Sequence, residues 1–117
     1  MLITSLIGTP SKVIAEPIEI KTDWSKAEIV TLIDETAEVY KVSAIVMKKV
    51  VQCESQYNTN AVNKTSKEYS IGLVQINRMA HPNITVEQAK NPEFALNFLA
   101  KNLKRGNGNM WSCYRYT

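Results

Sequence analysis

Residues 50–77 read VVQCESQYNTNAVNKTSKEYSIGLVQIN, and the rest of the chain is organised around this stretch. Its apolar beginning leads to an acid, Glu54, and it ends in the compact segment Gly-Leu-Val-Gln-Ile-Asn, residues 72–77. A carboxylate at the end of a buried helix is partly desolvated, which raises its pKa and lets it hold a proton near neutral pH. A general acid needs that property.

The residues between Glu54 and Gly72 are mostly Ser, Thr, Asn, Lys and Tyr. Their amide and hydroxyl groups can form the floor of a groove that holds a hydroxyl-rich ligand. The two features together lead to the hypothesis of a carbohydrate-cleaving site centred on Glu54. On the local sequence alone, the alternative is a surface glutamate at the end of a helix.

The chain has 117 residues, enough for one domain with a core and too few for two. Its net charge of +3 comes from scattered basic residues, so we expect no nucleic-acid partner. No apolar stretch approaches the roughly 18–20 residues that span a bilayer. Residues 1–22 predict an extended arm or leader, with a short strand near Ile18 to Lys21. We expect the chain to be a monomer.

Apolar residues recur at helical spacing after residue 23. They predict a helix capped by Asp23 or Ser25, and its apolar face is Trp24, Ala27, Val30, Ile33 and Ala37. A second helix is predicted from Ser43 to Cys53, with Ser43 at its N-cap. The residues that this helix would turn toward the core are Val42, Ile45, Val46, Val50 and Cys53.

Three further segments complete the predicted architecture. Residues 71–76 predict the start of a short helix, in which Gly72 lets the backbone pass close to a neighbour or to a ligand. Residues 85–88 have the spacing of a capping box for a short helix. The run Asn91-Pro92-Glu93 begins another helix, which Gly106 ends. The chain is therefore predicted to be mainly α.

Two cysteines, Cys53 and Cys113, leave several readings open. Spacing alone does not decide whether they are buried thiols or a pair. One histidine and two separated cysteines do not make a zinc set, so no metal is expected. A cysteine hydrolase that uses Cys53 and His81 is a further hypothesis, although no Asn or Asp is obviously placed to orient His81.

Four sequence blocks resemble the soluble lytic transglycosylase and goose-type lysozyme group. They are Glu54-Ser55 after Cys53, Gly72-Leu73-Val74-Gln75-Ile76-Asn77, Asn91-Pro92 and the late Tyr114. The blocks keep the family's order and cover about residues 40–117. The chain departs from the family pattern in having Val74 for a Met, a longer gap between Glu54 and Gln75, and Ser-Cys-Tyr-Arg-Tyr in place of Ala-Tyr-Asn-Ala-Gly.

The resemblance implies a small lysozyme-like helical domain over residues 23–117, with little or no β structure, a substrate cleft and no cofactor. Glu54 would be the catalytic acid and base, and Tyr114 would place its phenol near the Glu54 carboxylate. Gln75 would line the cleft and bind the sugar, with Tyr57 and Asn77 as further cleft residues. The substrate would be the MurNAc-GlcNAc strands of peptidoglycan, outside the cytoplasm.

The resemblance also implies a Cys53–Cys113 disulfide, because the family brings the neighbours Glu54 and Tyr114 together. Such a bond would support an exported or virion-associated protein, since disulfides persist in oxidising compartments.

Two mechanisms and one inactive alternative follow from the resemblance. Glu68 is a possible second carboxylate that would position a water, as in two-carboxylate glycosidases. Without it, Glu54 alone would cleave the bond, and the product would be a 1,6-anhydro sugar or, with water, a reducing end. The alternative is a catalytically silent module of the same fold that binds the cell wall or serves in assembly.

Overall fold

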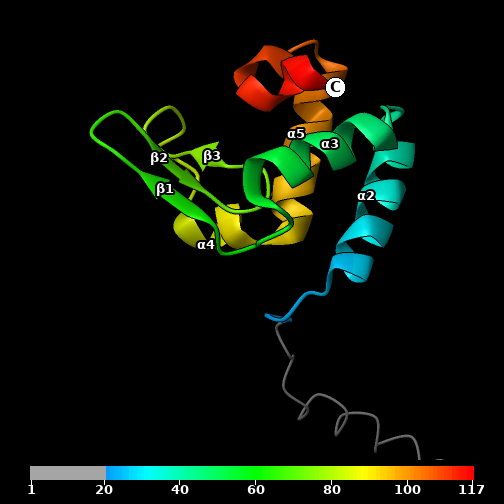
Figure 1. Cartoon of the computed structure of the whole chain (residues 1–117), viewed down its shortest axis with the longest axis horizontal. Coiled ribbons are helices and arrows are strands. Elements are labelled where there is room, and N and C mark those ends of the chain that lie inside the picture. The colour runs from blue at the N-terminus through cyan, green and yellow to red at the C-terminus, as the bar shows by residue number, and fades with distance from the viewer. Residues whose placement is uncertain (1–20) are drawn as a thin grey trace, which may run out of the picture.

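The computed structural model describes residues 21–117. Most of the expected arm, residues 1–22, and nearly all of the strand expected near Ile18 to Lys21 therefore lie outside the described residues. The helices are α2 (Lys26–Tyr40), α3 (Ala44–Ser55), α4 (Val86–Lys90) and α5 (Pro92–Lys104), followed by the 3₁₀ helices η2 (Gly108–Met110) and η3 (Ser112–Tyr116). The strands are β1 (Val62–Lys64), β2 (Tyr69–Ile71) and β3 (Ile76–Asn77). The predicted mainly α class is confirmed (Figure 1).

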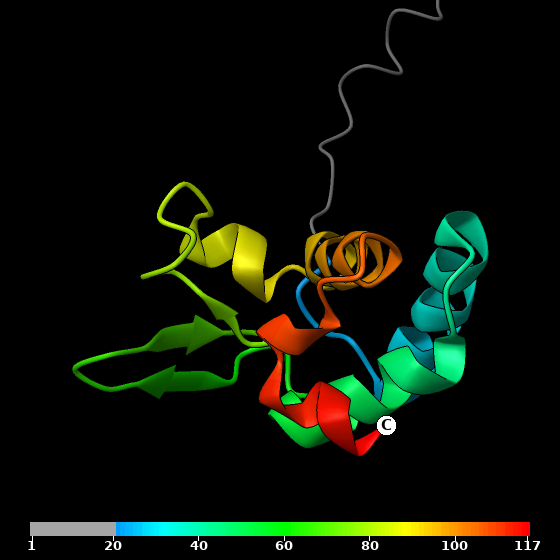
Figure 2. The same cartoon turned by 90° about the horizontal axis from the view of Figure 1, so that it is seen from above.

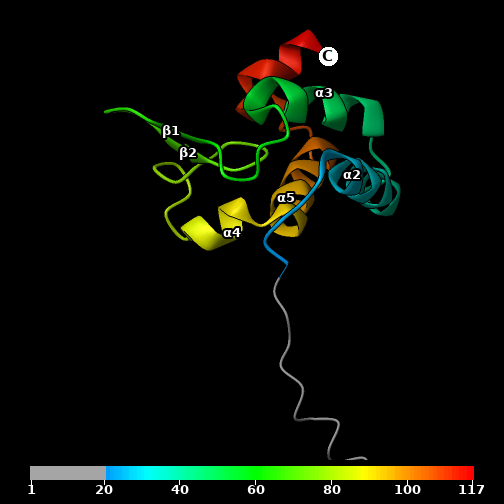
Figure 3. The ribbon, with the colours of Figure 1, turned by 60° about the horizontal axis from the view of Figure 1, so that its bottom comes forward.

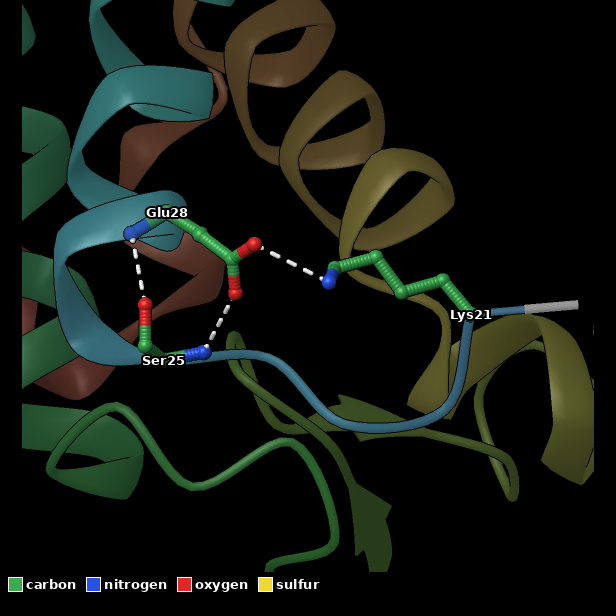
Figure 4. Close-up of polar contacts among 3 residues, drawn as sticks. All are labelled: Lys21, Ser25 and Glu28. Carbon is green, nitrogen blue, oxygen red and sulfur yellow. Dashed lines mark hydrogen bonds and ion pairs between the residues drawn. The ribbon is translucent and has the colours of Figure 1, made fainter.

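Helix α2 begins with a capping box, which decides between the two predicted caps in favour of Ser25. The Ser25 hydroxyl accepts the main-chain N–H of Glu28 at 3.1 Å, and the Glu28 carboxylate accepts the main-chain N–H of Ser25 at 2.9 Å (Figure 4). The Lys21 ammonium lies 2.9 Å from the second oxygen of Glu28. The Ser25 N–H and the Lys21 contact lower the pKa of Glu28, so this exposed carboxylate stays charged at the positive end of the helix dipole.

The other helix starts also follow the predicted caps. Ser43 caps α3 through the main-chain N–H of Val46. Thr85 begins α4 with a capping box, and Asn91 caps α5, whose first residue is Pro92. Each cap satisfies a main-chain N–H that has no partner within its helix.

The helix predicted to begin at residues 71–76 is wrong. Ile71 ends β2, Ile76 begins β3, and the three strands form an antiparallel sheet in the order β1-β2-β3. In register, Val62 faces Ile71 and Ile71 faces Ile76. Between β2 and β3, Gly72 and Gln75 have φ values of 86° and 52°, and such left-handed residues do not continue an α-helix.

Helix α5 lies near the centre of the molecule and packs against both α2 and α4. Figures 1 and 2 show the sheet on one side of α5 and α2 on the other. The core consists mainly of aliphatic residues from these elements; its largest fully buried members are Ile29, Ile33, Met47, Ile71, Leu73, Ile76, Leu96 and Leu99. Within residues 21–117, no helix combines the length and the apolar character that crossing a membrane requires.

The predicted core face of α3 is partly wrong. Ile45 is 66% exposed and Cys53 is exposed, whereas Met47, Val50 and Val51 are buried. The buried face is therefore rotated relative to the prediction, because α3 packs against α2 on one side and η3 on another. Apolar residues fill much of α3, so their spacing alone does not define one face.

Candidate active site

Glu54 lies in the last turn of α3 and is half-buried. Two residues later, Gln56 ends the helix in a left-handed conformation with a φ of 52°. Cys53 forms a disulfide with Cys113, whose Cα atom lies 5.9 Å from that of Cys53. The expected disulfide is thus present, and it attaches the C-terminal segment to the end of α3.

Burial raises the pKa of Glu54 above its ordinary value of 4.5. The main-chain N–H of Cys113, 3.4 Å from the Glu54 carboxylate, lowers this pKa, and the negative charge of Glu68 raises it. The net change is upward, so Glu54 keeps its proton to a higher pH than an exposed glutamate does. A carboxylic acid with a raised pKa can act as a general acid at a higher pH than an exposed glutamate can.

Glu68 lies in the turn just before β2, so the hairpin carries its carboxylate. The buried hydroxyl of Ser70 donates to that carboxylate at 2.6 Å. This charge-assisted hydrogen bond restricts the orientation of Glu68. The structure thus combines two acids of different environment, Glu54 partly desolvated and Glu68 held by a hydroxyl.

Ser55 connects the end of α3 to the turn after β2. Its buried hydroxyl donates to the carbonyl of Leu73 at 2.7 Å and contacts the carbonyl of Val51 at 3.2 Å. The Trp111 indole N–H donates to the carbonyl of Val74 at 2.7 Å. The two contacts hold residues 72–75 against both Glu54 and the C-terminal segment. The sequence alone did not predict these contacts of Ser55 and Trp111. The only features that pointed to the two residues were the Glu-Ser pair and the aromatic character of the C-terminal tail.

Gln75 and Asn77 both line a hollow of about 270 Å³. Its other lining residues are mostly apolar or aromatic: Ile76, Ala80, His81, Phe98, Met110 and Trp111. The aromatic rings contact each other edge to face, with 5.2 Å between the ring centres of His81 and Phe98 and 5.9 Å between those of Phe98 and Trp111. A polar edge beside aromatic walls is an arrangement that suits a sugar ring.

In each of the two side-chain amides of this hollow, one atom makes hydrogen bonds within the protein. The Gln75 amide nitrogen donates to the carbonyls of Ala61 and Gly72, at 3.2 and 3.1 Å. The Asn77 amide oxygen accepts the main-chain N–H groups of Tyr69 and Met79, at 3.1 and 3.0 Å. Within the described residues, the Gln75 oxygen and the Asn77 nitrogen make no hydrogen bond. Each amide therefore has one atom left for a ligand.

Tyr114 is the late tyrosine that was expected to place its phenol near the Glu54 carboxylate. Its ring packs on Gly108, where an added Cβ would come within 2.7 Å of the ring. Tyr114 also lines a small hollow with residues from the start of α3 and the end of α5. Within residues 21–117, no hydrogen bond joins Tyr114 to Glu54. The 3₁₀ geometry of η3 and the space above Gly108 place the phenol there.

Tyr57 is not among the residues that line the hollow of Gln75 and Asn77. It contacts the Lys26 ammonium, 4.9 Å from the centre of its ring, and lines a hollow beside the disulfide. The cysteine-hydrolase hypothesis is wrong, because Cys53 and Cys113 are disulfide-bonded and Cys53 offers no thiol.

A family model described as Transglycosylase SLT domain matches residues 31–115. The chain belongs to this family. The match begins within α2 and ends within η3, and it includes Glu54 and every residue that lines the Gln75 hollow. No curated protein matches the chain. The fold is that of the lysozyme-like superfamily, and SLT domains act on peptidoglycan outside the cytoplasm. The predicted family and fold are confirmed.

Proposed function

We propose that this SLT domain cleaves the β-1,4 bond between MurNAc and GlcNAc in peptidoglycan, with Glu54 as its single acid and base. The observation that carries the proposal is the environment of Glu54, a half-buried carboxyl group with a raised pKa at the end of α3. The family match supports the same substrate and the same class of reaction.

The chemistry moves two protons, one from Glu54 to the leaving oxygen and one from the attacking hydroxyl back to Glu54. Glu54 gives its proton to the glycosidic oxygen as the bond to the anomeric carbon breaks, and the oxygen of the sugar's N-acetyl group stabilises the positive carbon that forms. The Glu54 carboxylate then removes the proton of the 6-hydroxyl of the muramic acid, whose oxygen closes a 1,6-anhydro ring. Attack by a water in place of this hydroxyl gives a reducing end and the lysozyme reaction.

The hollow between Gln75 and Trp111 is the proposed place for a sugar next to the cleaved bond. The Gln75 oxygen and the Asn77 nitrogen would bind hydroxyl or N-acetyl groups, and Trp111 and Phe98 would contact the apolar face of the ring. The contacts of Ser55 and Trp111 with residues 73 and 74 support this placement, since they fix the hollow relative to Glu54. The reaction needs no cofactor.

The test is the release of soluble fragments from purified sacculi, followed by mass analysis. Glu54→Gln should lower the rate by at least about a hundredfold, the smaller end of the range for a lost general acid. Glu38→Gln, at an exposed position on α2, is the control with the same change in charge and should keep the wild-type rate. If Glu54→Gln releases fragments as fast as wild type, the chain is not this enzyme and the silent wall-binding module is the better reading.

The mass of the fragments distinguishes the two reactions. A product lighter by one water than the reducing sugar identifies a lytic transglycosylase, and the full reducing end identifies a lysozyme. The Cys53–Cys113 disulfide supports action in an oxidising compartment, such as the cell wall, the periplasm or a virion.

A further inference from the structure

A second hollow, of about 430 Å³, lies beside the disulfide and is not used by the proposed reaction. It is formed by the beginning of α2, the outer side of α3 and the 3₁₀ helix η3. Figure 2 shows η3 next to α3, and the two elements are in contact. We call this the lysine hollow; its lining includes Lys26, Lys48, Lys49, Tyr57 and Tyr116.

The lysine hollow carries an excess of positive charge. The Lys48 ammonium lies 2.9 Å from the carboxylate of Asp34, which neutralises it. The Lys26 ammonium lies over the ring of Tyr57, and Lys49 is exposed. Within residues 21–117, no ion pair joins Lys26 or Lys49 to a carboxylate. Two ammonium groups are therefore available to an anionic ligand.

The walls of the lysine hollow are largely apolar between these charges. The rings of Tyr57 and Tyr116 and the disulfide sulfur atoms line it. Its volume is within the range of about 300–1,000 Å³ that is usual for small-ligand sites. The hollow thus fits a short chain that carries both carboxylates and aliphatic carbons.

The disulfide connects the lysine hollow to Glu54. Cys53 and Cys113 both line the hollow, while Cys53 precedes Glu54 in the chain and the Cys113 N–H contacts the Glu54 carboxylate. A ligand in the hollow would therefore lie beside the residue that is proposed to act on the glycan. A substituent of the same polymer could occupy the hollow while the sugar chain lies at Glu54.

We infer that the lysine hollow binds the acidic stem peptide that muramic acid carries, an inference that rests on the proposed function for the choice of polymer. Lys26 and Lys49 bind the peptide carboxylates, and Tyr57 and Tyr116 contact its aliphatic carbons. A polyol phosphate offers the same charge but lacks aliphatic side chains for the two rings, so the tyrosines favour the peptide.

The direct test is the titration of a synthetic acidic stem tripeptide, free of sugar, into the protein, followed by NMR shifts and calorimetry. The double variant Lys26→Gln and Lys49→Gln should bind the tripeptide about fivefold more weakly, as expected for two exposed charge contacts. The matched control, Lys101→Gln with Lys104→Gln on α5, removes the same charge outside the hollow and should bind as wild type does.

Two further arms identify the ligand. The tripeptide with its carboxylates amidated should bind wild type about fivefold more weakly than the acidic tripeptide does, since it lacks the same charge contacts. A glycerol phosphate oligomer should also bind more weakly than the acidic tripeptide. Equal binding of the oligomer, or an equal loss of binding in the two double variants, would overturn the inference, since either result means general attraction of anions.

The binding test does not depend on cleavage, so the two proposals can fail separately. If the tripeptide binds through Lys26 and Lys49 but sacculi are not cleaved, the lysine hollow is supported and the proposed glycosidase is rejected. If sacculi are cleaved but the tripeptide binds equally to wild type and to the lysine-hollow variant, only the inference about the hollow is rejected.

Discussion

The main-chain N–H of Cys113 lies 3.4 Å from the side-chain oxygen of Glu54, although the two residues are 59 positions apart in the chain. The neighbouring disulfide maintains this contact, because Cys53 directly precedes Glu54 and is bonded to Cys113. The same covalent link therefore acts on two properties of the molecule. It lowers the conformational entropy of the unfolded chain. It also keeps an N–H donor at the carboxyl group that we propose to be catalytic.

Replacing both cysteines by serine should destabilise the protein by about 4 kcal/mol, as the chain-entropy model gives for a disulfide that closes a loop of this length. The residues it joins are separated by 60 positions. Urea unfolding of wild type and of the Cys53→Ser, Cys113→Ser variant measures this loss. Wild type treated with a reductant is the control without mutation and should lose a similar free energy of unfolding. A loss under 1 kcal/mol in both would contradict the role of the disulfide in stability.

The raised pKa of Glu54 predicts a particular pH dependence of stability. The folded state binds the Glu54 proton more tightly than the unfolded state, whose pKa is near the ordinary 4.5. This contribution to stability is fully present below that value and is lost as the pH rises through the folded pKa. Glu54→Gln should therefore gain stability relative to wild type as the pH rises from below the ordinary value of 4.5 through the raised pKa of the folded state. Thermal unfolding at several pH values measures the gain, and a difference that stays constant with pH would contradict it.

The charge of Glu68 should set part of the pH profile of the reaction. Glu68→Gln removes a negative neighbour, so the pKa of Glu54 should fall and the alkaline limb of kcat/KM should move to lower pH. Glu38→Gln is again the matched control and should leave the limb in place. If Glu68 also positions a water, Glu68→Gln should enrich 1,6-anhydro products over reducing ends, which mass analysis measures. A profile that does not move would mean that Glu68 does not act on Glu54 during the reaction.

The helix starts were predictable from the sequence because capping is local. Ser25, Ser43, Thr85 and Asn91 each accept a main-chain N–H a few residues ahead, so a short window contains the whole interaction. The apolar run before Glu54 placed that residue at the end of a helix, which was predicted to end at Cys53 and in fact ends at Ser55. The stability of these helices comes from packing, but their first residues do not depend on it.

The segment 71–76 and the position of Tyr114 were not predictable in this way. A short apolar run fits a strand as well as a buried helix, and here Gly72 and Gln75 turn the chain between two strands. Tyr114 lies on Gly108 because of the path of η2 and η3, which contacts distant in the sequence determine. Gln75 lines a hollow, and the partial use of its amide by Ala61 and Gly72 depends on the folded turn.

Gly72 allows the turn after β2 to approach α4, and Figure 3 shows that helix beside the sheet. A Cβ at Gly72 would lie 2.0 Å from the carbonyl oxygen of Ala89, at a φ of 86°. Gly72→Ala should therefore destabilise the protein by about 3–5 kcal/mol, through both the clash and the backbone strain. It should also slow cleavage, since Gly72 directly precedes Leu73, the partner of Ser55.

Gly106 is the matched control for that prediction. Its φ is 81°, close to that of Gly72, but an added Cβ there meets nothing within 4 Å. Gly106→Ala should cost only about 1–2 kcal/mol, the strain of a left-handed residue alone. Urea unfolding measures the loss of unfolding free energy in each variant. The difference between the two losses is the contribution of the clash with Ala89. Equal losses would mean that the backbone angle is the whole effect and that α4 moves aside freely. A larger loss at Gly72 is expected, because main-chain atoms of Ala89 cannot rotate away as a flexible side chain can.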